Sequence, residues 1–248
     1  LRDARNLQNE FQEELENEIK KYKDVVIHRF SYITDEYSGQ KAIMNKDILD
    51  VMEIKEGEYW LGLKKARFFS WFYPFANPHV EQPKESPSRA YLQMVEAFIW
   101  SNYKPEEDEV ALELGSAPGG ASYAMVQRGI RVTGVDNAEM SETLLNHPLF
   151  THIKEPMQKV RDEHIPRPCH LLISDVNVMP SLNLSQVKRF MQLRPGIKNV
   201  FYTLKIGSKI TVPEILEHAK TFKRFGFREV GITQLPSSKS EILLFGKK

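Results

Sequence analysis

The sequence predicts an α/β protein built on a doubly wound, mostly parallel sheet of Rossmann type, with an antiparallel last strand and a small N-terminal α/β appendage. Apolar runs of strand length alternate with helical segments from residue 89 to the C-terminus. Residues 110–137 read as strand, glycine-rich turn, helix, strand and acid, which is the first half of a nucleotide-binding sheet. The last two strands are joined by the short segment 235–240, which favours a hairpin.

Residues 1–75 are expected to form the appendage, and residues 76–248 the main domain. Apolar residues at helical spacing predict a helix over 3–23, and we expect strands at 25–30 and 57–63 with a short helix at 46–52. Lys64, Lys65 and Arg67 precede five aromatic residues within 68–73. Cations beside aromatic rings hold phosphates and stack on bases, so one interpretation is a module that positions RNA. The other is a plain scaffold with a buried aromatic hinge.

The main domain begins after a proline-rich linker at 77–87, with Ser88 as the expected cap of a helix at 89–102. In the rest of the chain, segments with the apolar pattern of a strand alternate with segments that have the apolar spacing of a helix. Strands are expected at 110–114, 130–135, 150–153, 169–174, 199–204, 228–234 and 241–245, and helices at 121–128, 138–145, 184–193 and 212–225.

Composition narrows the class of protein. The 248 residues contain 34 basic and 33 acidic side chains, and a net charge of +1 argues against a protein that coats nucleic acid without specificity. The single cysteine, Cys169, excludes a disulfide framework, and the seven histidines show no metal-ligand spacing, so we expect no metal. No apolar run approaches the length of a membrane span, and the charged N-terminus has no signal-peptide pattern. We therefore expect a cytoplasmic protein.

The turn at 115–120 is the strongest candidate for a ligand site. It has neither GxGxxG nor GxxxxGK[ST], and its internal proline and short glycine pair suit a ligand without a pyrophosphate. Asp136 follows the turn by about twenty residues, where an acid accepts hydrogen bonds from both ribose hydroxyls of an adenosine. The competing interpretation is an ordinary turn whose glycines only ease packing.

The form ELGSAPGG resembles motif I of S-adenosylmethionine-dependent methyltransferases of the FtsJ-like group, which methylate RNA ribose 2′-hydroxyls. SPSRAYLQMVEAF, ELGSAPGG, VDN, ISDV, TLKIGSK and SKSEILLF follow in the order expected for that group, and the pattern is most similar to RlmM-type enzymes of large-subunit ribosomal RNA. The resemblance implies S-adenosyl-L-methionine as the cofactor and RNA, ribosomal above all, as the partner. It implies cofactor contacts at Ser88, Gly115, Ser116, Ala117, Pro118, Gly119, Gly120, Ala121, Asp136, Asn137, Glu155 and Asp175.

The catalytic residues are expected where strands end, because open α/β sheets bind ligands at their carboxyl edge. A lysine that ends an apolar strand needs a partner, and Asp175 is the natural one for Lys205. By the resemblance, Asp175, Lys205 and Glu241 fill the last three places of a Lys-Asp-Lys-Glu tetrad. Lys205 would steer the ribose hydroxyl, or deprotonate it if burial lowers the lysine pKa, while Asp175 and Glu241 would hold the site. The alternative is a buried ion cluster that holds the strand ends together.

Two departures from the family pattern keep other functions open. The first tetrad place is Gln93, which brings no charge, and Lys209 is a candidate substitute. Pro156 stands where an acid is expected to read the adenine amino group, with Glu155 beside it. The alternative is therefore a weak or inactive relative that binds RNA or cofactor. A methyltransferase for protein or small molecules is disfavoured by the absence of NPP[YF], and a dinucleotide oxidoreductase by the absence of GxGxxG.

Overall fold

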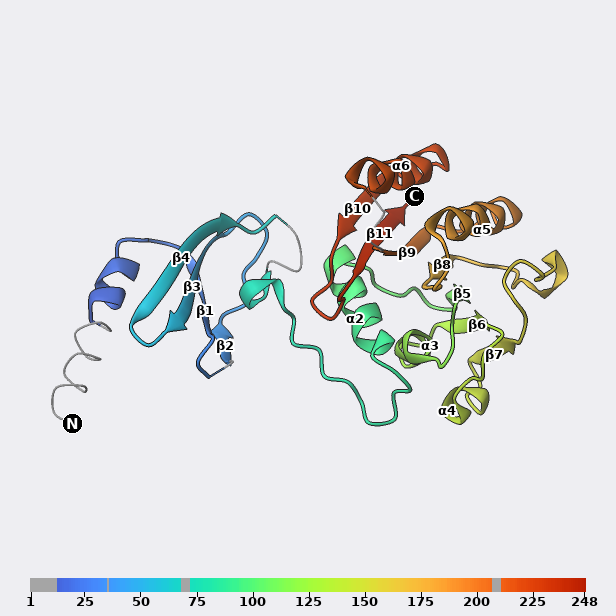
Figure 1. The fold of residues 1–248 in the computed structure, drawn as a ribbon, viewed down its shortest axis with the longest axis horizontal. Helices are drawn as coiled ribbons and strands as arrows, with labels where there is room; N and C mark the ends of the chain where they lie inside the picture. Colours follow the sequence, from blue (N-terminus) through green and yellow to red (C-terminus); the bar gives the residue numbers. More distant parts are fainter. Residues whose placement is uncertain (1–12, 35, 68–71, 207–210) are drawn as a thin grey trace. The chain divides into compact units, whose positions relative to one another are not determined.

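The computed structural model describes residues 13–34, 36–67, 72–206 and 211–248 (Figure 1). The chain forms two compact units, Leu1–His79 and Val80–Lys248. The division after His79 falls close to the boundary expected after residue 75. Within the described ranges, every helix is too short or too polar to cross a membrane.

The smaller unit is a four-stranded sheet with the order β2-β1-β3-β4, in which β1 and β3 are parallel and the other neighbours are antiparallel. Residues 13–19 are helical, and Leu15 and Ile19 pack against Leu49 and Val51 of the sheet. The elements are β1 (Val26–Ser31), β2 (Glu36–Gly39), β3 (Asp47–Lys55), β4 (Glu58–Lys65) and the 3-10 turn η2 (Pro74–Ala76).

The helix expected at 46–52 is wrong, because this segment is the strand β3. Ile48, Leu49 and Met52 are spaced so that they would lie on one side of a helix, so the pattern of this segment also fits a helix. In the structure Leu49 and Val51 face the helical residues 13–19, while Ile48 packs with Ala42 and Ala66 in a second cluster. A strand covered on both faces loses the polar and apolar alternation that would have identified it.

The basic and aromatic segment at 64–73 is only partly described. Lys64 and Lys65 form ion pairs with Asp50 and Asp47 at 2.5 and 3.1 Å. Phe72 is buried, and residues 68–71 lie outside the described part of the chain. The RNA-positioning role of this segment stays a prediction.

The larger unit contains a seven-stranded sheet with the order β10-β11-β9-β8-β5-β6-β7. The prediction of a doubly wound sheet with an antiparallel last strand is confirmed, since β11 runs antiparallel to both of its neighbours and β5 to β9 are mutually parallel. The strands are β5 (Val110–Leu114), β6 (Arg131–Val135), β7 (Phe150–Ile153), β8 (Leu171–Ser174), β9 (Asn199–Lys205), β10 (Glu229–Thr233) and β11 (Glu241–Lys247).

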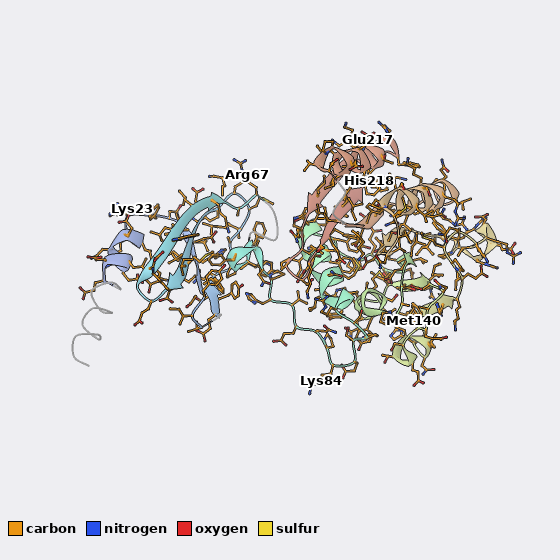
Figure 2. All side chains as sticks on the ribbon, in the orientation of Figure 1. Lys23, Arg67, Lys84, Met140, Glu217 and His218 are labelled. Carbon is orange, nitrogen blue, oxygen red and sulfur yellow. The ribbon has the colours of Figure 1, made fainter. Side chains whose placement is uncertain are left out.

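Helices cover both faces of this sheet, and side chains fill the space between the layers (Figure 2). One core lies under α2 (Ala90–Ser101), α3 (Gly120–Val126) and α4 (Glu142–Leu145), and includes Phe98 and Phe201. The other lies under α5 (Pro180–Leu193) and α6 (Val212–Arg224), and includes Phe190 and Phe222. A 3-10 turn, η3 (Asp162–His164), lies between β7 and β8.

The strand order reverses between β5 and β8, which places the turns after these strands side by side. Leu114 pairs with Ser174 in register, so Gly115 and Asp175 leave the sheet at the same point. Such a switch point is where open α/β sheets bind ligands. The carboxyl edge of β5, β6 and β8 is therefore the place to examine for a site.

Candidate active site

The turn after β5 requires glycine for steric reasons, as Gly115 and Gly120 show. Gly115 has φ +80°, and a Cβ there would lie 2.4 Å from the carbonyl oxygen of Asp175. A Cβ at Gly120, the first residue of α3, would lie 2.3 Å from the hydroxyl of Ser88. Ser88 is therefore a packing neighbour of α3. The expectation that Ser88 caps α2 is wrong, because Arg89 is the N-cap and no side chain caps this helix.

Asp136 closes the turn from the end of β6. Its Oδ2 accepts from the backbone N–H of Ala117 at 3.1 Å, and its Oδ1 accepts from that of Ala138 at 2.9 Å. The two bonds fix the carboxylate in one orientation, and each oxygen keeps a lone pair for another donor. This carboxylate can therefore accept hydrogen bonds from the two hydroxyls of a bound ribose.

A cavity of about 540 Å³ opens at this edge of the sheet. Its size falls in the usual range for small-molecule sites. The walls come from the segments that follow β5, β6, β7 and β8. They are Gly115, Ala117, Val135, Asp136, Asn137, Glu155, Pro156, Met157, Gln158, Asp175, Val176, Asn177 and Val178.

Six of the residues expected to contact a cofactor line this cavity, and the other six are not among its lining residues. The lining six are Gly115, Ala117, Asp136, Asn137, Glu155 and Asp175. The other six belong to the turn or the start of α3, or in the case of Ser88 lie beside it, and are Ser88, Ser116, Pro118, Gly119, Gly120 and Ala121. Met157 and Gln158 also line the cavity, although the sequence analysis did not include them. They come directly after Pro156, so a longer candidate segment after β7 would have included them.

The four residues expected to be catalytic lie together at the ends of β8, β9 and β11. Lys205 Nζ lies 2.6 Å from Asp175 Oδ1 and 2.5 Å from Glu241 Oε1. Lys205 and Glu241 are direct partners in the antiparallel β9–β11 pair. Gln93, from α2, donates from Nε2 to Glu241 Oε2 at 2.6 Å. Lys209 lies outside the described residues.

The charges of this cluster determine its protonation. One ammonium meets two carboxylates, and Gln93 adds no charge. Burial alone would lower the pKa of Lys205, but Asp175 and Glu241 outweigh burial and raise it. Lys205 is therefore an ammonium at neutral pH, so the condition under which it would deprotonate the hydroxyl, a pKa lowered by burial, is not met. Burial raises the pKa of Asp175, with Lys205 opposing and Glu241 adding to the effect. Asp175 is thus the carboxylate suited to take up a proton.

Glu113 is a buried acid beneath the turn that sequence reasoning overlooked. It is 2% exposed, and the hydroxyl of Ser122 on α3 donates to it. Burial raises the pKa of Glu113 to about 8, and the charges of Asp175 and Asp136 act in the same direction. The sequence feature that could have revealed this buried acid is a glutamate inside the otherwise apolar strand VALEL. Glu113 is therefore largely protonated at neutral pH.

The solved structures most similar to this fold include a Plasmodium falciparum protein assigned as a ribosomal RNA methyltransferase. It has a TM-score of 0.50 at 18% identity and covers 65% of this chain and 97% of its own. A Streptococcus thermophilus protein assigned as a hemolysin has a TM-score of 0.54 at 15% identity, covering 91% of this chain and 79% of its own. Both likenesses confirm the fold.

Sequence comparison identifies the family. The chain is 30% identical over 207 residues to ribosomal RNA large subunit methyltransferase M of Pseudomonas syringae pv. tomato, which covers 77% of this chain and 56% of the relative. The same enzyme of Azoarcus sp. is 28% identical over 211 residues, covering 80% and 56%. The chain thus spans little more than half the length of these relatives. Residues 87–241 match the model for FtsJ-like methyltransferase. The chain belongs to the FtsJ-like methyltransferase family.

Proposed function

We propose that this protein is an S-adenosylmethionine-dependent methyltransferase that modifies a ribose 2′-hydroxyl of large-subunit ribosomal RNA. One observation supports this most strongly. Lys205 lies between Asp175 and Glu241, and Asp175 also lines the cavity of about 540 Å³. A cation held by two acids beside a nucleoside-sized cavity suits the orientation of a hydroxyl nucleophile.

The residues of the cavity fit the proposed cofactor. Asp136 would hold the ribose hydroxyls, and Glu155 or the backbone near Pro156 would accept from the adenine amino group. The acidic lining suits a ligand with a cationic sulfur and an ammonium. When bound, S-adenosylmethionine supplies a methyl group on a positively charged sulfur, which becomes a neutral thioether on transfer.

The chain's own groups would prepare the acceptor hydroxyl. The ammonium of Lys205 would donate a hydrogen bond to the 2′-oxygen, which orients the oxygen and favours its loss of a proton. Asp175, with its raised pKa, would receive that proton. Glu241 would keep Lys205 in place while Gln93 fixes the second carboxylate oxygen of Glu241.

The acceptor is proposed from the relatives, which carry the name ribosomal RNA large subunit methyltransferase M. Such a substrate would place the protein in the cytoplasm. We also propose that residues 1–75 help to position the RNA and that residues 76–248 carry out the methyl transfer.

The test is to identify the methylated atom. The chain is incubated with ribosomal RNA and S-adenosylmethionine that carries a radiolabelled methyl group, and the RNA is digested to nucleosides. The proposal predicts label in 2′-O-methylated nucleosides only. Label in a base-methylated nucleoside would contradict the ribose assignment, and label in added ribosomal protein but not in RNA would contradict the acceptor class.

Gln93 supports a second candidate, a relative that binds the cofactor but transfers methyl groups poorly. With Gln93 the cluster of Lys205, Asp175 and Glu241 keeps an excess negative charge. The substitution Gln93→Lys would neutralise that charge and restore the family tetrad. If the wild-type chain binds S-adenosylhomocysteine in calorimetry, shows no transfer, and gains transfer in Gln93→Lys, this candidate replaces the first. Transfer by the wild-type chain at a rate similar to that of the variant would exclude it.

A further inference from the structure

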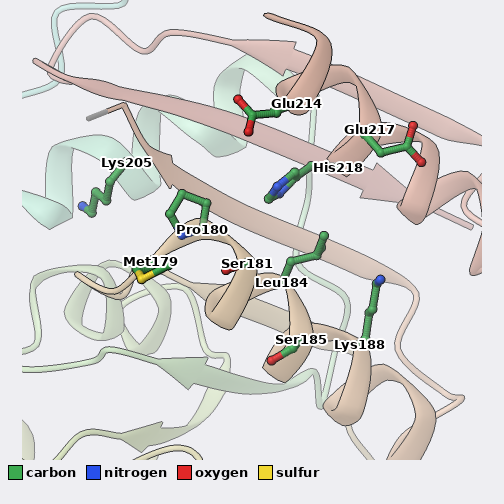
Figure 3. Close-up of a pocket in the computed structure, with 10 residues that line it drawn as sticks. All are labelled: Met179, Pro180, Ser181, Leu184, Ser185, Lys188, Lys205, Glu214, Glu217 and His218. Carbon is green, nitrogen blue, oxygen red and sulfur yellow. The ribbon is translucent and has the colours of Figure 1, made fainter. Parts of the chain in front are cut away.

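A second cavity lies between α5 and α6, on the sheet face opposite α2 and α3 (Figure 3). Its volume is about 600 Å³, and it shares no lining residue with the cavity assigned to the cofactor. We call it the α5–α6 groove. It is lined by Met179, Pro180, Ser181, Leu184, Ser185 and Lys188 from α5 and its N-cap, by Glu214, Glu217 and His218 from α6, and by Lys205.

The α5–α6 groove begins at the catalytic cluster. Lys205, which pairs with Asp175 and Glu241, lies at one end, and Lys188 lies at the other (Figure 3). The groove runs along α5 from Pro180 to Lys188, and these two positions are about 12 Å apart along the helix axis. An RNA strand with one ribose at Lys205 therefore has a neighbouring nucleotide within reach of the groove.

The walls of the groove suit a nucleobase. Met179 is 72% exposed at the start of α5, and Pro180 and Leu184 continue the apolar surface. The ring of His218, on α6 in Figures 2 and 3, lies 3.1 Å from the hydroxyl of Tyr202 through Nδ1. Burial, and then the charge of Lys188, lower the pKa of His218, so the ring is neutral. A neutral imidazole offers a base a flat face and its second ring nitrogen, which donates or accepts according to the tautomer.

The charges of the groove suit a phosphate at its far end. Glu214 already accepts from the N–H and hydroxyl of Thr211 at 2.7 and 2.8 Å. Glu217 pairs with Lys220 and Arg224 at 3.2 and 2.9 Å. Lys188, in contrast, has no carboxylate within 4.0 Å among the residues that the structure describes. Its ammonium is available to an external anion.

We infer that the α5–α6 groove binds the nucleotide of the substrate RNA that flanks the acceptor, with its base against Met179 and Leu184 and its phosphate at Lys188. This inference rests on the proposed function, which supplies RNA as the ligand. It assigns to α5 and α6 a share of substrate binding that is separate from cofactor binding and from the transfer step.

The test uses the methyl signal of Met179 in the full chain labelled with ¹³C at its methionine methyl groups, with S-adenosylhomocysteine present. The signal is assigned with Met179→Leu, and a pool of single-stranded RNA dodecamers of random sequence is added. Ser181→Trp places a large side chain in the groove from an exposed position. Gln192→Trp is the matched control, since Gln192 is exposed on α5 and does not line the groove.

The inference predicts that RNA shifts the Met179 signal, and that Ser181→Trp weakens RNA binding at least about tenfold whereas Gln192→Trp leaves it within about twofold. The affinity for S-adenosylhomocysteine should be equal in the wild type, Ser181→Trp and Gln192→Trp. No RNA-induced shift at Met179 would overturn the inference, whether or not RNA binds elsewhere. A shift caused by higher protein concentration without RNA would assign the groove to a second copy of the chain and would also overturn it.

Salt dependence tests the phosphate contact. Lys188→Gln should reduce the slope of log affinity against log salt concentration by about 0.7, the value for one phosphate of a single strand. Lys223→Gln, at an exposed position of α6, is the control and should keep the wild-type slope. An unchanged slope in Lys188→Gln would overturn the phosphate assignment.

Methyl transfer by the wild-type chain is measured separately, so that failure of the groove and failure of the proposed function can be told apart. Transfer without a Met179 response refutes only RNA binding in the groove. A Met179 response without transfer refutes only the proposed function.

Discussion

The buried carboxyl of Glu113 makes the stability of the larger unit depend on pH. Burial raises its pKa from the ordinary 4.5 to about 8 in the folded chain. Because the folded state holds the proton more tightly than the unfolded state, the stabilisation is fully present below pH 4.5 and is lost as pH rises through 8. Glu113→Gln is expected to remove this dependence, because glutamine has the same shape, stays neutral and can still pair with the Ser122 hydroxyl.

The magnitude follows from the two pKa values. Between them, the free energy of unfolding falls by about 1.4 kcal/mol for each pH unit. The full interval from 4.5 to about 8 corresponds to about 5 kcal/mol. The difference in unfolding free energy between Glu113→Gln and the wild type should therefore grow by about 3 kcal/mol from pH 5.5 to pH 8, in favour of the variant.

Urea unfolding at pH 5.5 and pH 8 measures this difference. Trp100 reports on the larger unit, because its ring packs against Phe245, and Trp60 and Trp71 are replaced by phenylalanine in every protein compared. Glu107→Gln, at an exposed position, is the control and should follow the wild type at both pH values. If Glu113→Gln keeps the same pH dependence as the wild type, the carboxyl is not held protonated by the fold and the reasoning fails.

Three further substitutions test the site. Asp136→Asn should weaken binding of S-adenosylhomocysteine at least about tenfold in calorimetry, because one acceptor becomes a donor; unchanged affinity would remove Asp136 from the site. Gly120→Ala should destabilise the larger unit by about 1–3 kcal/mol in urea, because its Cβ would lie 2.3 Å from the Ser88 hydroxyl; wild-type stability would contradict that contact. Asp175→Asn should lower the pKa of Lys205 and slow single-turnover transfer at least about 100-fold, and a wild-type rate would exclude Asp175 as the proton acceptor.

The sheet of the larger unit could be predicted from the sequence, because its apolar pattern agrees with its order of strands and helices. Its central strands are buried on both faces and appear as short apolar runs, each followed by a helix. The direction of β11 followed from the short connection at 235–240, which is too short for a parallel crossover. The smaller unit lacked such signals, since β3 has apolar residues on both faces and β2 is a mostly exposed strand with the sequence EYSG.

The positions of the site residues were also predictable, because a parallel sheet brings the ends of its strands to one edge. The chemistry of those residues was not. The sign of the Lys205 pKa shift depends on two carboxylates within 2.6 Å, and one of them comes from a strand 36 residues later. The protonation of Glu113 depends on its enclosure under α3, and the α5–α6 groove depends on how two helices pack. Such distances arise from tertiary packing, which no local pattern encodes.

The substitution Lys205→Met tests the central claim most directly, because it keeps a long unbranched side chain and removes the ammonium. Single-turnover methyl transfer to ribosomal RNA and calorimetry with S-adenosylhomocysteine are measured on the same protein, with Lys223→Met as the matched control. The account predicts that transfer falls at least about 1000-fold while cofactor affinity stays within about threefold of the wild type. Transfer by Lys205→Met at a rate close to that of the control would contradict it.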